Sequence, residues 1–380
     1  MHILPGFFSL LRKITLKNPK RTKILIYDYA GSEILIETIL QAQDYSVFPA
    51  RLEYFYGSPN ILIRIVGKFF SLNFQSLREI RGGIYKAYVL SCIEYIQPEI
   101  VITFIDNDFT FQWLSNNYHN AEFFAIQNGV RIKSCLTIRD STGIIRKISM
   151  PHFLCFGQND VDNYRKFGHE IHDPICLGSL KGGYYKHMTK EITSQNIFDI
   201  CIISQNTSPI DGLLHEDWVK NEQVILEMMT KYLQNNNKRV AVALRTSTDE
   251  EYDFFLNLFG NKITIVRPDE TGYSTYKTMD ISEVIVTNHS TAGFEAFGWG
   301  KKVMFCNFTG NEIYDIFNRD LFLVRQMDYN LFENKMNELL NKDQDEYLKS
   351  TEILRKYIMN FDPELPVHVY MRKIIENHIS

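Results

Sequence analysis

The sequence lacks the patterns that mark several large protein classes. No stretch approaches the ~18 consecutive apolar residues of a membrane-spanning helix, and we find neither an internal repeat nor a low-complexity tract. The six cysteines lie far apart and form no CxxC pair, so we expect reduced core thiols in a cytoplasmic protein. Arg12 and Lys13 follow directly on the first apolar residues, without a small-residue cleavage site, and therefore we expect no secretory signal.

Several enzyme motifs are also missing. The chain has no P-loop, no GxGxxG, no GxSxG and no cysteine–histidine pattern typical of covalent catalysis. What is present is an ordinary packed composition, with 45% hydrophobic and 23% charged residues among 380. At ~100–200 residues per domain, this length predicts about two domains.

Apolar strand patterns alternate with helical patterns along the chain. Nearly every predicted strand is apolar throughout, which is typical of a parallel sheet covered on both faces. We predict an α/β protein of two Rossmann-like, doubly wound parallel-sheet domains that face a cleft. The predicted parts are an N-terminal acceptor domain (1–180), a polar linker (181–197) and a C-terminal nucleotide domain (198–342). Final helices (343–380) are expected to pack back toward the first domain.

Local patterns give the predicted elements. The strands are expected at 23–27, 45–49, 100–104, 122–126, 153–156, 198–203, 239–244, 262–266, 283–287 and 302–306. The helices are expected at 33–43 with Ser32 as N-cap, and at 61–80, 84–96, 215–234, 249–259, 274–280, 343–358 and 366–379, with another from about 290 to Trp299.

Positive charge is concentrated in the first part of the chain. Residues 1–83 contain 11 Lys and Arg against 6 Asp and Glu, although the whole chain has a net charge of −4. Apolar residues accompany these cations in 1–23 and 61–81, so an anionic membrane surface is one predicted partner. The same pattern also fits helices packed on the core with snorkelling lysines. We expect no nucleic-acid partner.

The segment 284–305, VIVTNHSTAGFEAFGWGKKVMF, contains the strongest candidate site. A strand ends in a small polar turn that begins a helix, and such a helix start can hold a phosphate through free N–H groups and the Ser290 and Thr291 hydroxyls. Glu295 follows one turn later, where it could accept hydrogen bonds from a ribose. Alternatively, Ser290 only caps the helix and Glu295 is a solvated helix residue.

This segment resembles the Ser-Thr/Glu nucleotide-binding element of GT-B glycosyltransferases. Together with TFIDND, AIQNGVR, FGQNDVDNYRKFGH, LGSLKGGYY and YSTYKTMDISEV, it makes the chain similar to the bacterial surface carbohydrate (O-antigen or capsule) biosynthesis family. The resemblance implies a nucleotide-sugar donor in the C-terminal domain and an acceptor facing the N-terminal one. It implies donor contacts from Ser274, Tyr276, His289, Ser290, Thr291 and Glu295.

Arg245 follows a predicted strand, where sialyltransferases of this fold have a His-Pro pair that is absent from ALRTST. It can bind phosphate in a bidentate manner, or pair with Asp249 or Glu250. Gln127, Asn128 and Arg131 follow another strand and are candidates for acceptor binding, although Asn-Gly is also an ordinary turn.

A general base is needed if the enzyme inverts. The candidates are Asp28, Glu33 and Asp106, each at the carboxyl end of a predicted N-terminal strand. DYAGSE resembles a loop of Kdo transferases whose glutamate is the base, and Glu33 matches that position. The alternative for each carboxylate, and the more common role of such a residue, is a helix cap or an acid in the first turn of a helix. Asp106 and Asp108 mimic a metal-binding DxD motif, but that motif belongs to transferases with one nucleotide-binding domain, so we expect no metal and no cofactor.

These features predict a metal-independent glycosyltransferase that builds a surface polysaccharide on a glycan or lipid-linked glycan. The favoured donor is a CMP-activated nonulosonic or Kdo-like acid. A CDP-glycerol-type polyol-phosphate transferase and a non-catalytic nucleotide-binding protein are the alternatives. We expect a cytoplasmic location, with docking on the inner membrane as an extension of it.

Overall fold

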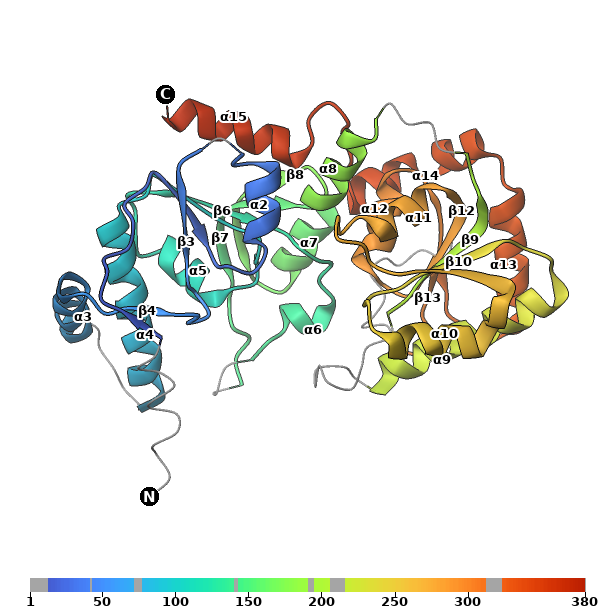
Figure 1. The fold of residues 1–380 in the computed structure, drawn as a ribbon, viewed down its shortest axis with the longest axis horizontal. Helices are drawn as coiled ribbons and strands as arrows, with labels where there is room; N and C mark the ends of the chain where they lie inside the picture. Colours follow the sequence, from blue (N-terminus) through green and yellow to red (C-terminus); the bar gives the residue numbers. More distant parts are fainter. Residues whose placement is uncertain are drawn as a thin grey trace, which may run out of the picture.

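Two parallel sheets, one in each half of the chain, dominate the architecture of the computed structural model (Figure 1). The structure describes residues 13–41, 43–71, 77–139, 143–190, 195–205, 216–311 and 323–379. The predicted α/β class with two doubly wound sheets is confirmed. Within these residues, no helix is both long and apolar enough to cross a membrane.

The first sheet has the strand order β3-β2-β5-β6-β7-β8, and all of its neighbouring strands are parallel. Its strands are β2 (Ile24–Tyr27), β3 (Tyr45–Phe48), β5 (Ile100–Thr103), β6 (Glu122–Ile126), β7 (Ser149–Cys155) and β8 (Glu170–Cys176). A separate short pair joins β1 (Ile14–Thr15) to β4 (Phe55–Tyr56). The fully buried apolar strands β2 and β5 lie near the sheet centre, as their sequences predict.

The helices of the first half are α2 (Ser32–Thr38), α3 (Pro59–Ser71), α4 (Leu77–Ile96), α5 (Phe109–Ser115), α6 (Lys133–Leu136) and α7 (Gln158–Lys166). Helix α2 differs from the prediction at both ends. Its N-cap is Gly31 rather than Ser32, with φ of 75°, and a Cβ at Gly31 would lie 2.6 Å from the Phe104 ring. The helix ends at Thr38 because Leu40 N–H donates to Leu35 O, five residues back.

The predicted break between helices at 81–83 is wrong. Helix α4 runs through Gly82 and Gly83, because the burial of residues such as Ala87 and Cys92 outweighs the ~1 kcal/mol that each glycine costs in a helix. The predicted helix at 61–80 matches α3 up to Ser71 and continues over 72–76, which lie outside the described residues, while 77–80 belong to α4.

The second sheet has the order β11-β10-β9-β12-β13-β14 and is also parallel throughout. Its strands are β9 (Phe198–Ile203), β10 (Val240–Ala243), β11 (Ile263–Val266), β12 (Ser282–Thr287), β13 (Lys302–Cys306) and β14 (Leu323–Val324). The accompanying helices are α9 (Glu216–Asn235), α10 (Asp249–Phe259), α11 (Ser274–Asp280), α12 (Thr291–Gly298), α13 (Tyr329–Asn341) and α14 (Gln344–Ile358).

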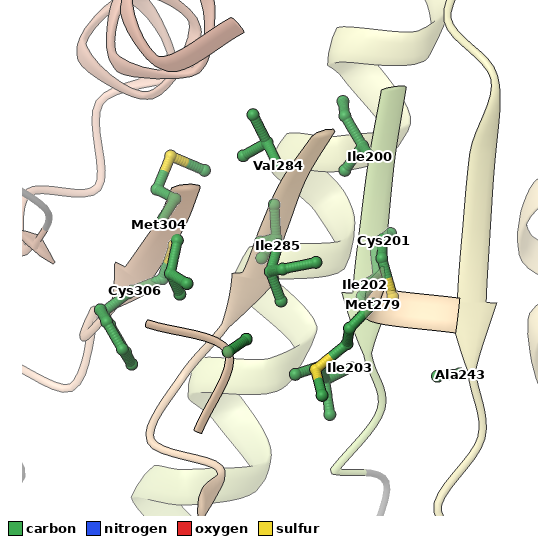
Figure 2. Close-up of a cluster of buried hydrophobic side chains, with 14 of the residues drawn as sticks. Ile200, Cys201, Ile202, Ile203, Ala243, Met279, Val284, Ile285, Met304 and Cys306 are labelled. Atoms are coloured by element: carbon green, nitrogen blue, oxygen red, sulfur yellow. The ribbon is translucent and has the colours of Figure 1, made fainter. Parts of the chain in front are cut away.

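Strands β9, β12 and β13 supply the centre of the C-terminal core. Figure 2 shows side chains such as Ile202, Ile285 and Met304 gathered beside these strands, and all three are buried. Strand β9 pairs with β10 on one side and β12 on the other, so its carboxyl end lies in the middle of the sheet edge. In a doubly wound sheet, this edge is where ligands bind.

The chain passes between the halves twice. The first passage contains helix α8 (Leu180–Met188), which occupies part of the segment predicted as a polar linker. Ser179 caps α8, and Leu180 and Tyr185 are buried, so this segment packs instead of remaining extended. The second passage leads to α15 (Val367–Ile379), whose Val367, Met371 and Ile375 join a core cluster of the first sheet.

Candidate functional site

A pocket of about 360 Å³ opens at the carboxyl edge of the second sheet. Residues that follow β9 and β10 line it together with residues at the starts of α11 and α12. Four residues predicted to contact the donor are among them, and helix α8 supplies a fifth polar side chain. These five are Arg245, Ser274, Tyr276, Ser290 and Lys181. The pocket therefore lies at the position that the sheet topology favours for a ligand.

The turn from β12 into α12 forms one wall. Ser290 is the N-cap residue of α12, but its side chain makes no capping hydrogen bond, so the alternative that it serves only as a cap is not supported. Gly293 allows the helix to start close to the strand, because a Cβ there would lie 2.5 Å from Thr287 Cγ2. Gly293 N–H donates to Ser290 O over 3.0 Å, which leaves the N–H groups of Thr291 and Ala292 without a partner within the helix.

Thr291 contacts the other half of the molecule instead of the pocket. Its Oγ1 accepts a hydrogen bond of 3.1 Å from the backbone N–H of Val130, in the loop after β6. The two halves thus meet at the start of α12. A role for the Thr291 hydroxyl in holding phosphate would require this contact to be exchanged.

Glu251 shapes the loop that presents Arg245. This glutamate on α10 is buried and accepts hydrogen bonds from the backbone N–H groups of Arg245 (3.0 Å) and Thr246 (2.7 Å). The hydroxyls of Ser204 and Thr246 also donate to it. The side chain of Arg245 is exposed. A buried carboxylate therefore fixes the backbone under an exposed guanidinium.

Glu295 does not have the open carboxylate expected of a ribose ligand. It is buried, Ser179 Oγ donates to its Oε1, and Tyr276 OH donates to its Oε2 over 2.8 Å. Burial raises the pKa of Glu295. In this structure, Glu295 links the start of α8 to α11 and α12, because both of its oxygens are engaged there. The alternative of a solvated helix residue is also wrong.

His289 precedes the helix start but is not among the residues that line the pocket. Burial lowers the pKa of His289 to about 3, which keeps the imidazole neutral at physiological pH. A neutral imidazole offers no positive charge to a phosphate. Tyr276 does reach the pocket, and its hydroxyl is used by Glu295.

Lys181 is a pocket residue that the sequence analysis missed. It follows the Ser179 cap on α8, and its Nζ lies 5.6 Å from the ring centroids of both Tyr273 and Tyr276. The available signal was the Ser-Leu-Lys-Gly-Gly sequence, which can begin a helix, but its glycines and polar surroundings favoured a linker. The pocket thus contains two basic side chains, Lys181 and Arg245.

Asp106 is buried in a network and is not available as a general base. Its carboxylate accepts hydrogen bonds from both Nε and Nη2 of Arg131, from the Asn128 backbone and from Tyr164 OH. Burial alone would lower the pKa of Arg131, but the charge of Asp106 outweighs it and raises that pKa. This pair is structural, and Asp108 beside it caps α5 through the N–H groups of Thr110 and Phe111.

The predicted acceptor residues belong to the same network. Asn128 Oδ1 accepts a hydrogen bond from Arg131. The buried Gln127 donates through Nε2 to Gly129 O and Asp160 Oδ1, and its Oε1 accepts from the Phe156 N–H. Their side chains hold the loop after β6, which contacts α12 through Val130. In this structure Gln127, Asn128 and Arg131 position this loop, and the acceptor role expected of them stays a prediction.

The remaining carboxylates differ in their surroundings. Asp28 is buried, has φ of 112°, accepts from the Ala30 N–H and pairs with Arg51 Nε at 2.8 Å. This pairing argues against Asp28 as a base. Glu33 is exposed in the first turn of α2 and has no hydrogen bond or ion pair to any described residue.

Helix α2 faces the second half of the molecule. Glu37, one turn after Glu33, raises the pKa of Tyr273 through its charge, after the larger effect of burial. Glu33 lies one turn before Glu37 on the same side of α2, because residues four apart share a helix face. Among the three predicted bases, only Glu33 is exposed, whereas Asp28 and Asp106 are buried. In the described part of the chain, no three His, Cys, Asp or Glu residues are grouped for metal binding.

Comparisons with known proteins agree with this architecture. The structure is similar to a Listeria monocytogenes protein described as a UDP-N-acetylglucosamine 2-epimerase, with a TM-score of 0.55, 12% identity, and coverage of 94% of this chain and 96% of the other. The co-structure of Staphylococcus aureus MnaA with UDP gives a TM-score of 0.52 and 12% identity, with coverage of 94% of this chain and 96% of the other. The wall teichoic acid polymerase TagF gives a TM-score of 0.51 and 10% identity, with coverage of 95% of this chain and 89% of the other. These likenesses support the predicted GT-B fold.

Sequence comparison identifies the family. No curated protein sequence matches this chain. A family model described as "putative O-antigen biosynthesis protein" matches residues 124–374, which is more than half of the chain and includes the entire pocket. By that match, the protein belongs to the O-antigen biosynthesis protein family.

Proposed function

We propose that this protein is a cytoplasmic glycosyltransferase that moves a sugar from a nucleotide donor to a surface-polysaccharide acceptor. The observation that carries the proposal is one arrangement of charges. A pocket with Lys181 and Arg245 lies at the carboxyl edge of one sheet, and an exposed carboxylate, Glu33, follows a strand of the facing sheet. Family membership supports the acceptor class that we propose, a glycan or a lipid-linked glycan.

The donor phosphate would bind between the two cations and the start of α12. Lys181 and Arg245 supply positive charge, the Ser290 hydroxyl has no capping bond, and Ser290 and Ala292 at the start of the helix line the pocket. These groups would also stabilise the charge that develops on the phosphate as it leaves. In this proposal, protein side chains stabilise the leaving group without a metal or another cofactor.

The acceptor would be activated by Glu33. The carboxylate removes the proton of the acceptor hydroxyl, whose oxygen attacks the anomeric carbon of the donor. The bond from that carbon to the phosphate oxygen breaks, and its electron pair leaves with the nucleotide. The attack comes from the face opposite to the leaving group, so the anomeric configuration inverts.

For the donor, we propose a CMP-activated nonulosonic or Kdo-like acid. Its support is the resemblance of the Asp28–Glu33 loop to that of Kdo transferases, while the missing His-Pro pair distinguishes this pocket from sialyltransferases. A CDP-glycerol-type transfer is the second candidate, because the TagF structure obtained with CDPG has a similar fold.

A nucleotide panel in a thermal-shift assay tests the proposal. CMP, CDP, UDP, GDP, dTDP, CDP-glycerol and UDP-N-acetylglucosamine would each be added to the full chain. A ligand at a hundredfold its Kd stabilises the folded state by about 2.7 kcal/mol. Lys181→Ala and Arg245→Ala should remove the shift, whereas Lys349→Ala, an exposed lysine on α14, should not.

Each outcome separates the candidates. Stabilisation by CMP supports the favoured donor, and stabilisation by CDP-glycerol alone supports the polyol-phosphate transferase. Epimerisation of UDP-N-acetylglucosamine without transfer to an acceptor would replace the transferase proposal. If no nucleotide changes the melting temperature, the pocket is not a nucleotide site and the proposal fails.

A further inference from the structure

Helix α3 has an unusual distribution of side chains. A surface helix normally buries one apolar stripe and exposes polar residues on the other side. Ile61 of α3 is buried and Ile65 is half-buried in the core of the first domain. Positions 59, 62, 63 and 66 lie on the opposite side of a helix with 3.6 residues per turn. Three of these are large aliphatic residues.

This outer side is exposed. Leu62, Ile63 and Val66 have exposed fractions of 51%, 72% and 56%, and we call these three residues the α3 outer face. The helix lies at the far left of Figure 1, at the end of the molecule remote from the second sheet. Neither the first domain core nor the second domain therefore covers the α3 outer face.

The charged residues of α3 do not interrupt that face. The only two are Arg64 and Lys68, and both pair with Glu94 of α4, at 3.7 Å and 2.5 Å. Their charges are directed toward α4, where they anchor the helix. The outer positions 59, 62, 63 and 66, in contrast, include no charged residue. Such an apolar side is unfavourable when it faces only water.

Cationic residues border the outer face at the start of the helix. Asn18 Oδ1 accepts a hydrogen bond from Ser58 Oγ at 2.6 Å, so the segment after β1 lies beside the first turn of α3. This segment contains Leu16, which is 77% exposed, and Lys17, whose ammonium has no partner among the described residues. Lys13 is exposed nearby on the same strand segment.

Lys13 Nζ donates to Leu52 O, but neither Lys13 nor Lys17 has an acidic partner among the described residues. An apolar helix face beside such lysines is the combination that binds an anionic lipid surface. The aliphatic side chains enter the boundary between head groups and acyl chains, while the lysines remain with the phosphates. A second protein copy would explain the apolar residues but not the adjacent excess of positive charge, since the same patch on both copies would place like charges together.

We propose that the α3 outer face, with Leu16 and Lys17 beside it, docks this protein on an anionic membrane. The helix would lie in the plane of the interface, because no described helix can span the bilayer. This inference does not depend on the proposed transferase activity. It names a binding surface in the first domain, whereas the proposed donor pocket lies in the second.

Co-sedimentation of the full chain with vesicles tests the proposal. The expected result is binding to phosphatidylglycerol–phosphatidylethanolamine vesicles, weakened by salt, and no binding to phosphatidylcholine alone. The triple variant Leu62→Ser, Ile63→Ser, Val66→Ser should bind at least about tenfold more weakly, since burial of a single aliphatic side chain already accounts for about that factor. Lys17→Ala should lower binding about fivefold on the anionic vesicles.

A matched control replaces exposed apolar residues elsewhere. Ile144→Ser, Met327→Ser, Ile353→Ser changes three side chains with equal or greater exposure and should leave vesicle binding unchanged. The melting temperature of both triple variants should stay near that of the parent, because all six residues are exposed.

Four results would overturn the proposal. The first is failure of the parent to bind anionic vesicles. The second is equal binding by the parent and the α3 triple variant. The third is loss of binding on deletion of residues 1–12, with the α3 variant still bound, which would assign docking to that segment. The fourth is concentration-dependent dimerisation that the α3 variant abolishes, because a second copy would then cover the face.

Discussion

The carboxylate of Glu251 should be needed for the pocket to keep its shape. We expect Glu251→Gln, which retains the size of the side chain, to destabilise the C-terminal domain and to weaken nucleotide binding. Each oxygen of Glu251 accepts from one backbone N–H and one hydroxyl: Oε1 from Arg245 and Ser204, and Oε2 from both groups of Thr246. An amide can replace only one of these oxygens as an acceptor.

The size of the effect follows from these contacts. In either amide orientation, one part-buried backbone N–H loses its acceptor, which costs about 1–3 kcal/mol, whereas the adjacent hydroxyl can rotate and accept from the amide. The other two hydrogen bonds lose the strengthening that a charged acceptor provides. A total of about 3 kcal/mol would lower the melting temperature of a domain of 150–250 residues by about 6–12 °C.

Thermal unfolding followed by circular dichroism, with isothermal titration of the best nucleotide, measures both effects. Glu250→Gln is the matched control, because Glu250 is exposed on the neighbouring position of α10 and has no partner among the described residues. Equal melting temperatures for Glu251→Gln and Glu250→Gln would refute the reasoning. A stable Glu251→Gln that binds nucleotide as the parent does would show that the Arg245 loop needs no support.

Three further predictions concern the proposed reaction and its pH dependence. Glu33→Gln should reduce transfer at least about a hundredfold without changing donor affinity, because it removes the proton acceptor. Asp106→Asn should instead lower the melting temperature, because it leaves Arg131 without its ion pair. A fully active Glu33→Gln enzyme would exclude Glu33 as the base. In titration calorimetry, Ser290→Ala should weaken nucleotide binding about fivefold or more. Thr291→Ala should weaken it less, because the Thr291 hydroxyl accepts a hydrogen bond from Val130. A greater loss of affinity for Thr291→Ala than for Ser290→Ala would place the phosphate elsewhere. Burial raises the pKa of Asp160 to about 7, from about 3.9 in an unfolded chain. The folded protein therefore binds this proton more tightly than the unfolded chain does. The resulting stabilisation of the folded state is complete below about pH 3.9 and is lost as the pH rises through 7. Asp160→Asn should flatten the dependence of the urea midpoint on pH between about 5 and 8, and an unchanged slope would assign that dependence to other groups.

Much of the fold follows from local sequence patterns. The apolar runs that give β9, β12 and β13 are buried on both faces of a parallel sheet, and such burial leaves few alternatives for a short run of Ile, Val and Phe. Helix α8 was missed for a physical reason. Its polar and glycine residues become helical because Leu180 and Tyr185 find apolar surfaces in both halves of the molecule, which local propensity does not report.

The candidate site was predictable only in part. The Ser290 turn and Arg245 were found because strand ends converge at one edge of a sheet. The partners of Asp106 and Glu295 were not predictable from one sequence, since Arg131 and Ser179 are 25 and 116 residues away. A carboxylate at a strand end looks the same in sequence whether it faces solvent, as Glu33 does, or a guanidinium. The difference depends on tertiary contacts.

Helix α15 has a consequence for how the protein is made. Its Val367, Met371 and Ile375 cover Ile24, Ile100 and Ile126 of the first sheet, although these residues are separated by more than two hundred positions in the chain. During synthesis, this face of the first sheet stays uncovered until the residues of α15 have left the ribosome. The N-terminal domain therefore cannot complete its core first, and a nascent chain arrested before residue 367 should expose apolar surface to chaperones.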